Sequence, residues 1–219
     1  MDFDLFDPMA PVSVTRRALP HWYQTGVTYF VTFRTADSMP AEVIDEWRAN
    51  RDQWLRAQGL DADDPTWKLR LLHLPRELQS EYSRKFNGEF HRLLDSGHGE
   101  CLLRHPDVRE VVVSALKYFD GQRYHLAAFV VMPNHVHLLL GLIGDNTTTG
   151  ICYSWKKFTA TRINRLLRRT GHFWQGESFD HIVRSPEQFD YLVRYIANNP
   201  AKAALKTGEF AHYQSEPST

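Results

Sequence analysis

The chain has 219 residues, of which 42% are hydrophobic and 13% aromatic, a composition that indicates one sizeable folded core and excludes a disordered chain. Its 26 Lys and Arg side chains balance 26 Asp and Glu side chains, so any surface for a polyanion must be local. Two cysteines, an acidic N-terminus and the lack of a long apolar run argue against a disulfide framework, a signal peptide and a membrane span.

The first 35 residues predict an arm followed by a strand. Residues 1–20 are mixed in polarity and interrupted by prolines, as in a surface arm. Arg16 and Arg17 lie in this arm as candidate phosphate contacts, and a solvated tail is the simpler alternative. Residues 26–34 alternate apolar and smaller side chains, with Val27, Tyr29 and Val31 on one face, which predicts a buried strand.

Residues 36–100 have a different pattern. Helices are expected over 42–58 and from 74 onward, where Leu78, Tyr82, Phe86 and Phe90 recur at helical spacing, and 59–65 reads as a polar loop between them. We therefore expect 36–100 to be a helical insertion that covers one edge of a sheet, within a single domain that spans 1–219.

The next segment predicts a helix, two strands and another helix. Residues 106–119 and 153–169 carry helical apolar stripes, and 123–131 and 134–142 read as strands joined through Pro133 and Asn134. Because strand side chains alternate between faces, His135 and His137 point the same way. Such a pair is either two metal ligands or two core histidines satisfied by hydrogen bonds, and the pattern alone does not decide.

The last third is the basic part of the chain. Residues 150–209 contain ten Lys or Arg and five Asp or Glu. Clustered cations with interleaved aromatic rings are typical of contacts to a phosphate backbone, although a solvated helix face explains them too. The candidates in and after the expected helix are Lys156, Lys157, Arg162, Arg165, Arg168 and Arg169.

The final expected helix begins at a strong start signal. Ser185 is an N-cap residue, Pro186 follows it, and Gln188 completes a capping box. The helix is expected to reach about residue 198 and to stop at Pro200. Tyr195 and Asn199 then lie one turn apart at the edge of the apolar stripe, where a side chain can reach a cleft.

Together these residues suggest a phosphoryl-transfer site. His135 and His137 offer two nitrogen ligands and Asn199 offers a carbonyl oxygen. This mixed donor set with open positions suits Mg²⁺ or Mn²⁺ engaged with phosphate better than closed structural zinc. Tyr195, one turn from a ligand, is placed to attack a phosphodiester held there.

Several of these motifs, in this order, resemble a known family. Residues 133–137 resemble the HUH motif (His, hydrophobic, His) of single-tyrosine transposases. Residues 173–175, 179–184 and 195–200 resemble the REP-associated tyrosine transposases. The resemblance runs from about Tyr124 to Leu205, with 27–35 as the expected first strand, and the block at 36–100 is longer than in the short members.

The resemblance implies an α+β fold, a ferredoxin-like sandwich whose antiparallel central sheet carries the HUH strand. It also implies nicking of single-stranded or hairpin, REP-like DNA and strand transfer through a 5′-phosphotyrosine on Tyr195. The divalent metal, Mg²⁺ or Mn²⁺, would be held by His135, His137 and Asn199. Such a protein would work in the prokaryotic cytoplasm at the nucleoid, as a monomer or homodimer, and away from membranes.

Within the matched motifs, two residues have two readings each and a third, Arg184, is a candidate DNA contact. Trp174 is either a ring on which a base stacks or a plain core residue. His181 is either a DNA contact or a histidine with a structural hydrogen bond, and Arg184 belongs to the same motif.

Two other functions stay open. One is a domesticated nucleic-acid-binding protein without cleavage activity, which would bind DNA in a salt-sensitive manner. The other is a metal-dependent hydrolase that uses zinc and an activated water on His135 and His137, and it requires a third strong ligand that no sequence motif supplies.

Overall fold

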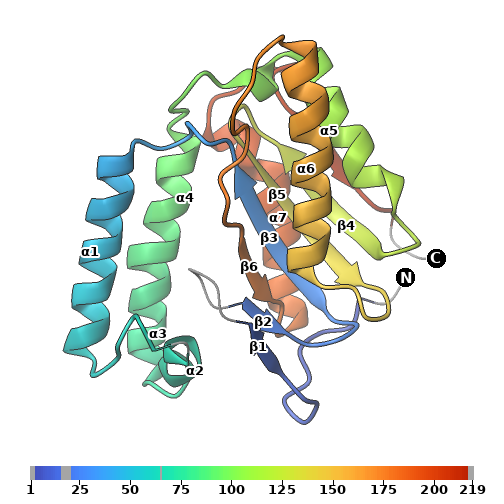
Figure 1. Cartoon of the computed structure of the whole chain (residues 1–219). Coiled ribbons are helices and arrows are strands. Elements are labelled where there is room, and N and C mark those ends of the chain that lie inside the picture. Colours follow the sequence, from blue (N-terminus) through green and yellow to red (C-terminus); the bar gives the residue numbers. More distant parts are fainter. Residues whose placement is uncertain (1–2, 16–20, 65, 217–219) are drawn as a thin grey trace.

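The computed structural model describes residues 3–15, 21–64 and 66–216, so Arg16 and Arg17 lie outside the described residues. Figure 1 shows a central sheet flanked by helices. The elements are β1 (Ser13–Thr15), β2 (His21–Tyr23), β3 (Thr28–Arg34), α1 (Ala41–Ala57), α2 (Trp67–Leu72), α3 (Arg76–Tyr82), the π-helical turn η1 (Ser83–Asn87), α4 (Gly88–Asp95), the 3₁₀ turn η2 (Leu102–Arg104), α5 (Pro106–Tyr118), β4 (Tyr124–Val131), β5 (His135–Leu142), α6 (Thr148–Leu166), β6 (Phe179–Ile182), α7 (Pro186–Lys202) and β7 (Ala211–Gln214).

The main sheet has the strand order β6-β3-β5-β4-β7, and every neighbouring pair is antiparallel. The chain visits β3, α5, β4, β5, α6 and β6 in turn, so four strands and two helices follow the split β-α-β arrangement of ferredoxin-like folds. β7 extends the sheet at the β4 edge. The predicted α+β, ferredoxin-like class with an antiparallel central sheet is confirmed.

The two faces of this sheet bury separate cores. One core joins the sheet to α5 and α6 through residues such as Val136, Leu138 and Trp155. The other joins it to α7 through residues such as Leu139 and Ile196. Because side chains alternate along β5, His135 and His137 lie on the α7 face, while α6 covers the opposite face.

The structure differs from the sequence-based elements at three places. The helix expected from residue 74 is divided into α3, η1 and α4, which ends at Asp95, and α2 and β7 carry no clear sequence pattern. Pro200 does not stop α7, which continues to Lys202. A proline removes only its own N–H bond, and the following amides still bond, as Leu205 N does to the carbonyl oxygen of Pro200.

The described part of segment 36–100 is helical, with α1 and α4 side by side next to the sheet (Figure 1). It buries its own aromatic cluster, which includes Trp54, Tyr82 and Phe86. Its C-terminal end is held by Asn134, whose Nδ2 donates to the carbonyl oxygens of Leu94 at 3.4 Å and His98 at 3.0 Å. The turn that starts β5 therefore sets the position of α4.

None of the helices in the described ranges is both long and apolar enough to cross a lipid bilayer.

Between the sheet and α6, a buried hydroxyl supports the core under the site. Tyr124 Oη donates to the carbonyl oxygen of Leu116 at 2.7 Å and accepts from Trp155 Nε1 at 3.1 Å. We expect Tyr124→Phe to lower the free energy of unfolding by about 1–3 kcal/mol, because two buried groups lose their partner. Urea denaturation measures this change, with Tyr118→Phe as the control because Tyr118 is exposed. Equal stability of the two variants would contradict the prediction.

Candidate functional site

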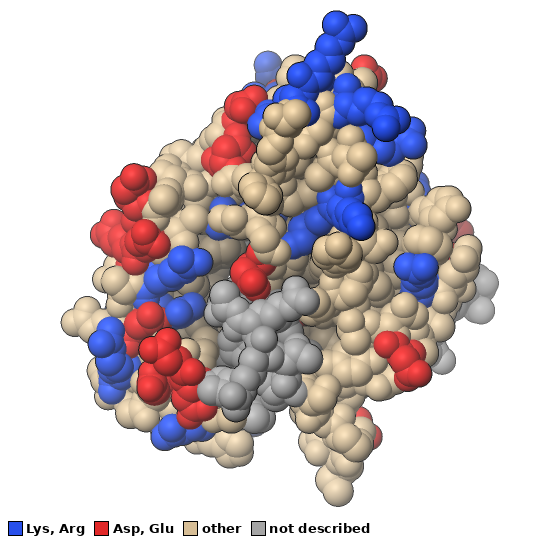
Figure 2. Space-filling model, viewed as in Figure 1, with Lys and Arg blue, Asp and Glu red and all other residues tan. Residues whose placement is uncertain are grey.

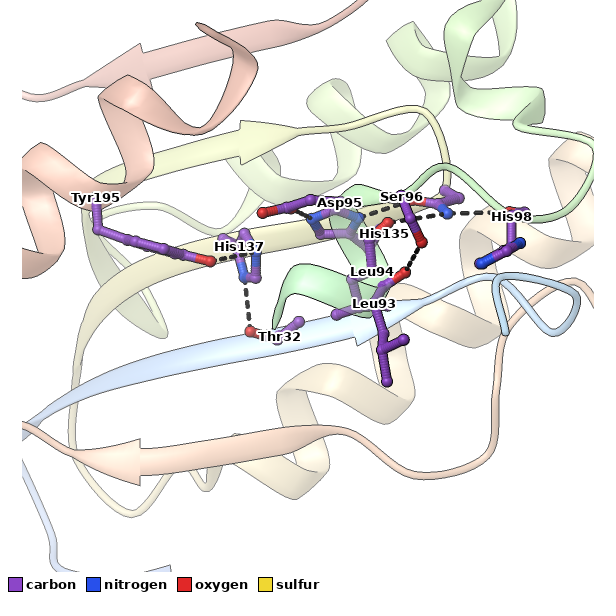
Figure 3. Close-up of polar contacts among 10 residues, drawn as sticks. Thr32, Leu93, Leu94, Asp95, Ser96, His98, His135, His137 and Tyr195 are labelled. Carbon is purple, nitrogen blue, oxygen red and sulfur yellow. Dashed lines mark hydrogen bonds and ion pairs between the residues drawn. The ribbon is translucent and has the colours of Figure 1, made fainter. Parts of the chain in front are cut away.

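Both imidazoles of β5 are fully buried and held by their Nδ1 atoms (Figure 3). Asn134 Oδ1 lies 2.7 Å from Nδ1 of His135. Because an amide oxygen only accepts, Nδ1 of His135 carries the proton. Thr32 Oγ1 lies 2.7 Å from Nδ1 of His137. With Nδ1 held in this way, Nε2 of His135 faces Asp95 and Nε2 of His137 faces the Tyr195 hydroxyl. Hydrogen bonds to the other ring nitrogen orient the histidine ligands of metal sites in the same manner.

Tyr195 points from α7 toward these imidazoles (Figure 3). Its hydroxyl lies 3.4 Å from Nε2 of His137, and the two rings are 5.3 Å apart between centroids. Burial raises the pKa of Tyr195, the Asp95 carboxylate raises it further, and Asn199 lowers it. The phenol is therefore protonated at neutral pH. The structure brings together Tyr195, His135 and His137 from two distant segments, as the sequence predicted.

Asp95, at the end of α4, is a site residue that the sequence analysis missed. Its Oδ1 is buried without a hydrogen bond among the described residues and faces Nε2 of His135 at 3.6 Å. Burial raises the pKa of Asp95 to about 6, and Lys202 opposes this shift. No spacing links Asp95 to the histidines. The available signal is local: an acidic residue ends a helix, where the dipole disfavours negative charge, and such broken rules mark functional sites.

Asn199 is fully buried one turn after Tyr195, and neither polar atom of its amide has a hydrogen-bond partner among the described residues. It lies close enough to favour the Tyr195 phenolate without forming a well-aligned hydrogen bond. A buried amide without partners costs free energy, so an additional ligand would relieve it. The role of Asn199 as a metal ligand stays a prediction.

The side chains of Asp95, His135 and His137 fit a divalent cation. One ligand atom from each lies within 4.8 Å of the others. Two bonds of about 2.0–2.2 Å to one ion span at most about 4.4 Å, so small side-chain shifts would bring all three onto a single ion. The set leaves coordination positions open for a phosphate, as Mg²⁺ and Mn²⁺ sites do.

The basic residues of α6 are not part of this site. Lys156, Lys157, Arg162 and Arg165 lie on α6, and Arg168 and Arg169 follow it, on the face of the sheet opposite to Tyr195. Figure 2 shows Lys and Arg side chains gathered over the end of this helix. Some of them have protein partners, since Lys156 donates to the carbonyl oxygen of Gly176 and Arg169 pairs with Glu100. The α6 cations therefore do not adjoin Tyr195, and their contact with DNA stays a prediction.

Trp174 is a core residue. Its side chain is 6% exposed, its Nε1 donates to Thr159 Oγ1 at 2.8 Å, and its ring packs edge-on against Phe33. The indole therefore offers no open face to a base, and of its two readings the structure supports the core residue.

Two other predicted DNA contacts, His181 and Arg184, lie on the same side of the sheet as Tyr195. His181 packs beside Phe30 and is 3.4 Å from Nε2 of Gln188. His181 and Arg184 both line a cavity that Tyr195 and Asp95 also line. Both residues therefore share a cavity with Tyr195, and their contact with DNA stays a prediction.

One family model matches part of the chain. The family model described as "Transposase IS200 like" matches residues 102–199. No curated protein matches the sequence. Among solved structures, the chain is similar to a REP-associated tyrosine transposase bound to a REP hairpin, with 18% identity over 87% of this chain and 73% of that chain and a TM-score of 0.43. A putative transposase from Deinococcus radiodurans R1 shows 16% identity over 81% of this chain and 93% of that chain, with a TM-score of 0.35.

The family match runs from η2 into α7 and contains both histidines of β5, Tyr195 and Asn199, whereas Asp95 precedes it. Over residues 102–199, this chain is similar to the IS200-like transposases.

Proposed function

We propose that the protein nicks single-stranded DNA and transfers the strand through a phosphotyrosine on Tyr195, with a divalent metal. The observation that carries the proposal is the convergence of Tyr195 with the imidazole pair, its hydroxyl 3.4 Å from His137 Nε2. A phenol beside paired imidazoles and a buried carboxylate is an arrangement for covalent catalysis at phosphorus.

The metal would be held by His135, His137 and Asp95, with Asn199 as the further oxygen donor. When bound, Mg²⁺ or Mn²⁺ supplies positive charge that polarises a phosphoryl oxygen and favours a phenolate nearby. The residues around the ligands maintain their orientation. Asn134 fixes the proton of His135 on Nδ1 and also holds the end of α4 that carries Asp95.

In the proposed reaction, the Tyr195 oxygen attacks the scissile phosphorus. The new bond joins this oxygen to phosphorus, and the bond between phosphorus and the 3′-oxygen breaks. The phenol gives up its proton and the departing 3′-oxygen takes one up, so the products are a 5′-phosphotyrosine and a free 3′-hydroxyl. A later attack by a 3′-hydroxyl on the phosphotyrosine reverses these steps and rejoins strands, so no external energy source is required.

The preferred substrate would be DNA with an unpaired region next to a hairpin. This part of the proposal rests on the resemblance of residues 173–200 to REP-associated transposases. A solved relative of similar fold carries a REP hairpin in its description. His181 and Arg184, which line the same cavity as Tyr195, would contact such DNA.

A second candidate function is favoured by Asp95. A hydrolase with zinc and an activated water lacked its third strong ligand in the sequence, and the carboxylate of Asp95 provides one next to His135 and His137. In this alternative the water, rather than Tyr195, attacks phosphorus, and no covalent intermediate forms. The two functions are distinguished by the dependence on the Tyr195 hydroxyl.

The nucleophile is tested with a labelled single-stranded hairpin oligonucleotide and Mn²⁺. We expect the wild-type protein to form a protein–DNA band that survives denaturation. Tyr195→Phe should form none and should still bind the oligonucleotide, because only the attacking oxygen is lost. Tyr191→Phe, with the same change one turn earlier on α7, is the matched control and should retain the adduct.

Three other results would contradict the proposal in different ways. A persistent adduct in Tyr195→Phe would refute the assignment of the nucleophile. Strand cleavage without any adduct, unchanged in Tyr195→Phe, would support the hydrolase. Salt-sensitive binding with neither adduct nor cleavage in Mg²⁺ or Mn²⁺ would support the domesticated binding protein.

Asp95 should destabilise the metal-free protein at neutral pH. Because its folded-state pKa is raised from 3.8 to about 6, the folded state binds this proton more tightly than the unfolded chain. Stability is therefore lost as the pH rises from about 4 to about 6, and the loss is complete above that range. Asp95→Asn should thus raise the free energy of unfolding at pH 8 by about 2 kcal/mol and have little effect at pH 4. Urea denaturation in EDTA measures both values.

Added Mn²⁺ should make the wild-type protein more stable than Asp95→Asn. An ion that binds only the folded state stabilises it, so the wild-type protein should gain stability on titration with Mn²⁺, and Asp95→Asn should gain less. Glu89→Gln on the same helix is the control and should respond as the wild type does. Equal stabilisation of wild type and Asp95→Asn by Mn²⁺ would contradict the role of Asp95 as a ligand.

A further inference from the structure

A groove runs between the helical insertion and the α7 face of the sheet. Its volume is about 1010 Å³, at the upper end of the range for sites that enclose a drug-sized ligand. We call it the insertion groove. Its insertion wall includes Trp67, Tyr82, Arg84 and Arg92, its opposite wall includes His181, Arg184, Tyr191 and Lys202, and Asp95 and Tyr195 line it as well. The nucleophile therefore faces a space with one wall that the family match does not cover.

Both walls of the insertion groove carry exposed cations. Arg84 and Arg92 come from the insertion. Arg184 lies just before α7, and Lys202 is its last residue. The lining includes two carboxylates, Asp95 and Asp180. Asp180 is buried and accepts from Thr148 Oγ1, and Asp95 belongs to the metal cluster. Arg92 also pairs with Glu89 of its own helix at 3.8 Å. The exposed charged side chains that line the groove are thus all cations, which matches a phosphate backbone.

An exposed ring lies next to the nucleophile. Tyr191 is 59% exposed although it is a large aromatic residue. Its ring is roughly parallel to that of Tyr195, with centroids 6.4 Å apart. Unpaired bases stack on such rings regardless of sequence, because every base has a π-face. A base flanking a phosphate held at Tyr195 would find Tyr191 as its platform.

The insertion wall has a local irregularity at the groove. The π-helical turn η1 interrupts the helix between α3 and α4, and its residues Ser83, Arg84 and Asn87 all line the groove. Single π-turns inside helices occur frequently at functional sites. The polar side chains of this turn face the space beside Tyr195 instead of the aromatic cluster that holds the insertion together.

We propose that the insertion groove holds the unpaired strand that flanks the scissile phosphate. In this arrangement Arg84 and Arg92 contact phosphates from one side, Arg184 and Lys202 contact them from the other, and Tyr191 stacks on a base. The insertion thus acts as the second half of a single-strand channel. This inference rests on the proposed function, and the binding assay below does not depend on cleavage.

Binding is measured with a fluorescent oligothymidylate of 20 nucleotides, in EDTA, in the Tyr195→Phe background so that no covalent capture occurs. Arg84→Ala combined with Arg92→Ala should weaken binding by about tenfold and lower the salt slope of log K by about 1.4, since each lost phosphate contact contributes about 0.7. Tyr191→Ala should also weaken binding by about tenfold, with a smaller change in salt slope, and Tyr191→Phe should not.

Two charge-matched variants serve as controls. Arg48→Ala with Arg56→Ala removes two exposed cations from α1, outside the groove lining, and should leave binding unchanged. Lys157→Ala with Arg165→Ala removes two cations from α6 on the opposite face. If the α6 variant loses affinity while the Arg84 and Arg92 variant does not, the groove is refuted and the strand binds α6.

Photo-crosslinking locates the strand independently of affinity. An oligothymidylate that carries 5-iodouracil should crosslink to peptides containing Tyr191 or residues 82–92, and crosslinks confined to α6 would overturn the proposal. Failure of the groove proposal can be distinguished from failure of the proposed function. Adduct formation that is unaffected by loss of Arg84 and Arg92 would refute the groove alone, and groove-dependent binding without any adduct would refute the nuclease alone.

Discussion

The side chain of Asn134 joins the two halves of the site. Its oxygen fixes the proton of His135 on Nδ1, and its nitrogen donates to the carbonyl oxygens of Leu94 and His98. One buried amide therefore orients His135 on β5 and holds the end of α4 that places Asp95 beside it. Because every polar atom of this amide is used, neither element can shift without leaving a buried group unpaired. The geometry of the metal cluster and one wall of the groove depend on this contact.

Side chains alternate along β5, so one face of the strand packs in the core and the other faces the candidate site. Val136, Leu138 and Leu140 fill the core under α5 and α6, while His135 and His137 face α7. The basic helix α6 therefore lies on the face of the sheet opposite to Tyr195. The cations that line the cavity at Tyr195 come instead from the insertion, from Arg184 just before α7 and from Lys202 at the end of α7. A chain with no net charge can still present a local positive surface in this way.

The site is organised at a cost to the metal-free protein. Asp95 is a carboxylate at a helix C-terminus with a raised pKa, Tyr195 is a phenol made less acidic by burial, and Asn199 is a buried amide without partners. Each of these features is unfavourable alone, and the proposed cation among these three side chains would relieve each of them. Such concentration of local strain and desolvation is typical of catalytic sites.

The sequence by itself determined the elements whose signals are local. Alternation defined β3, two apolar runs joined at a Pro-Asn turn defined β4 and β5, and the N-cap at Ser185 defined the start of α7. His135, His137 and Tyr195 were found because their spacing on a strand and a helix is fixed by backbone geometry. Only the tertiary structure decided the contribution of Asp95 and the insertion wall, the assignment of α6 to the opposite face, and the burial of Trp174. These depend on contacts between segments far apart in the chain, and no residue spacing encodes which face of a sheet a distant helix will cover.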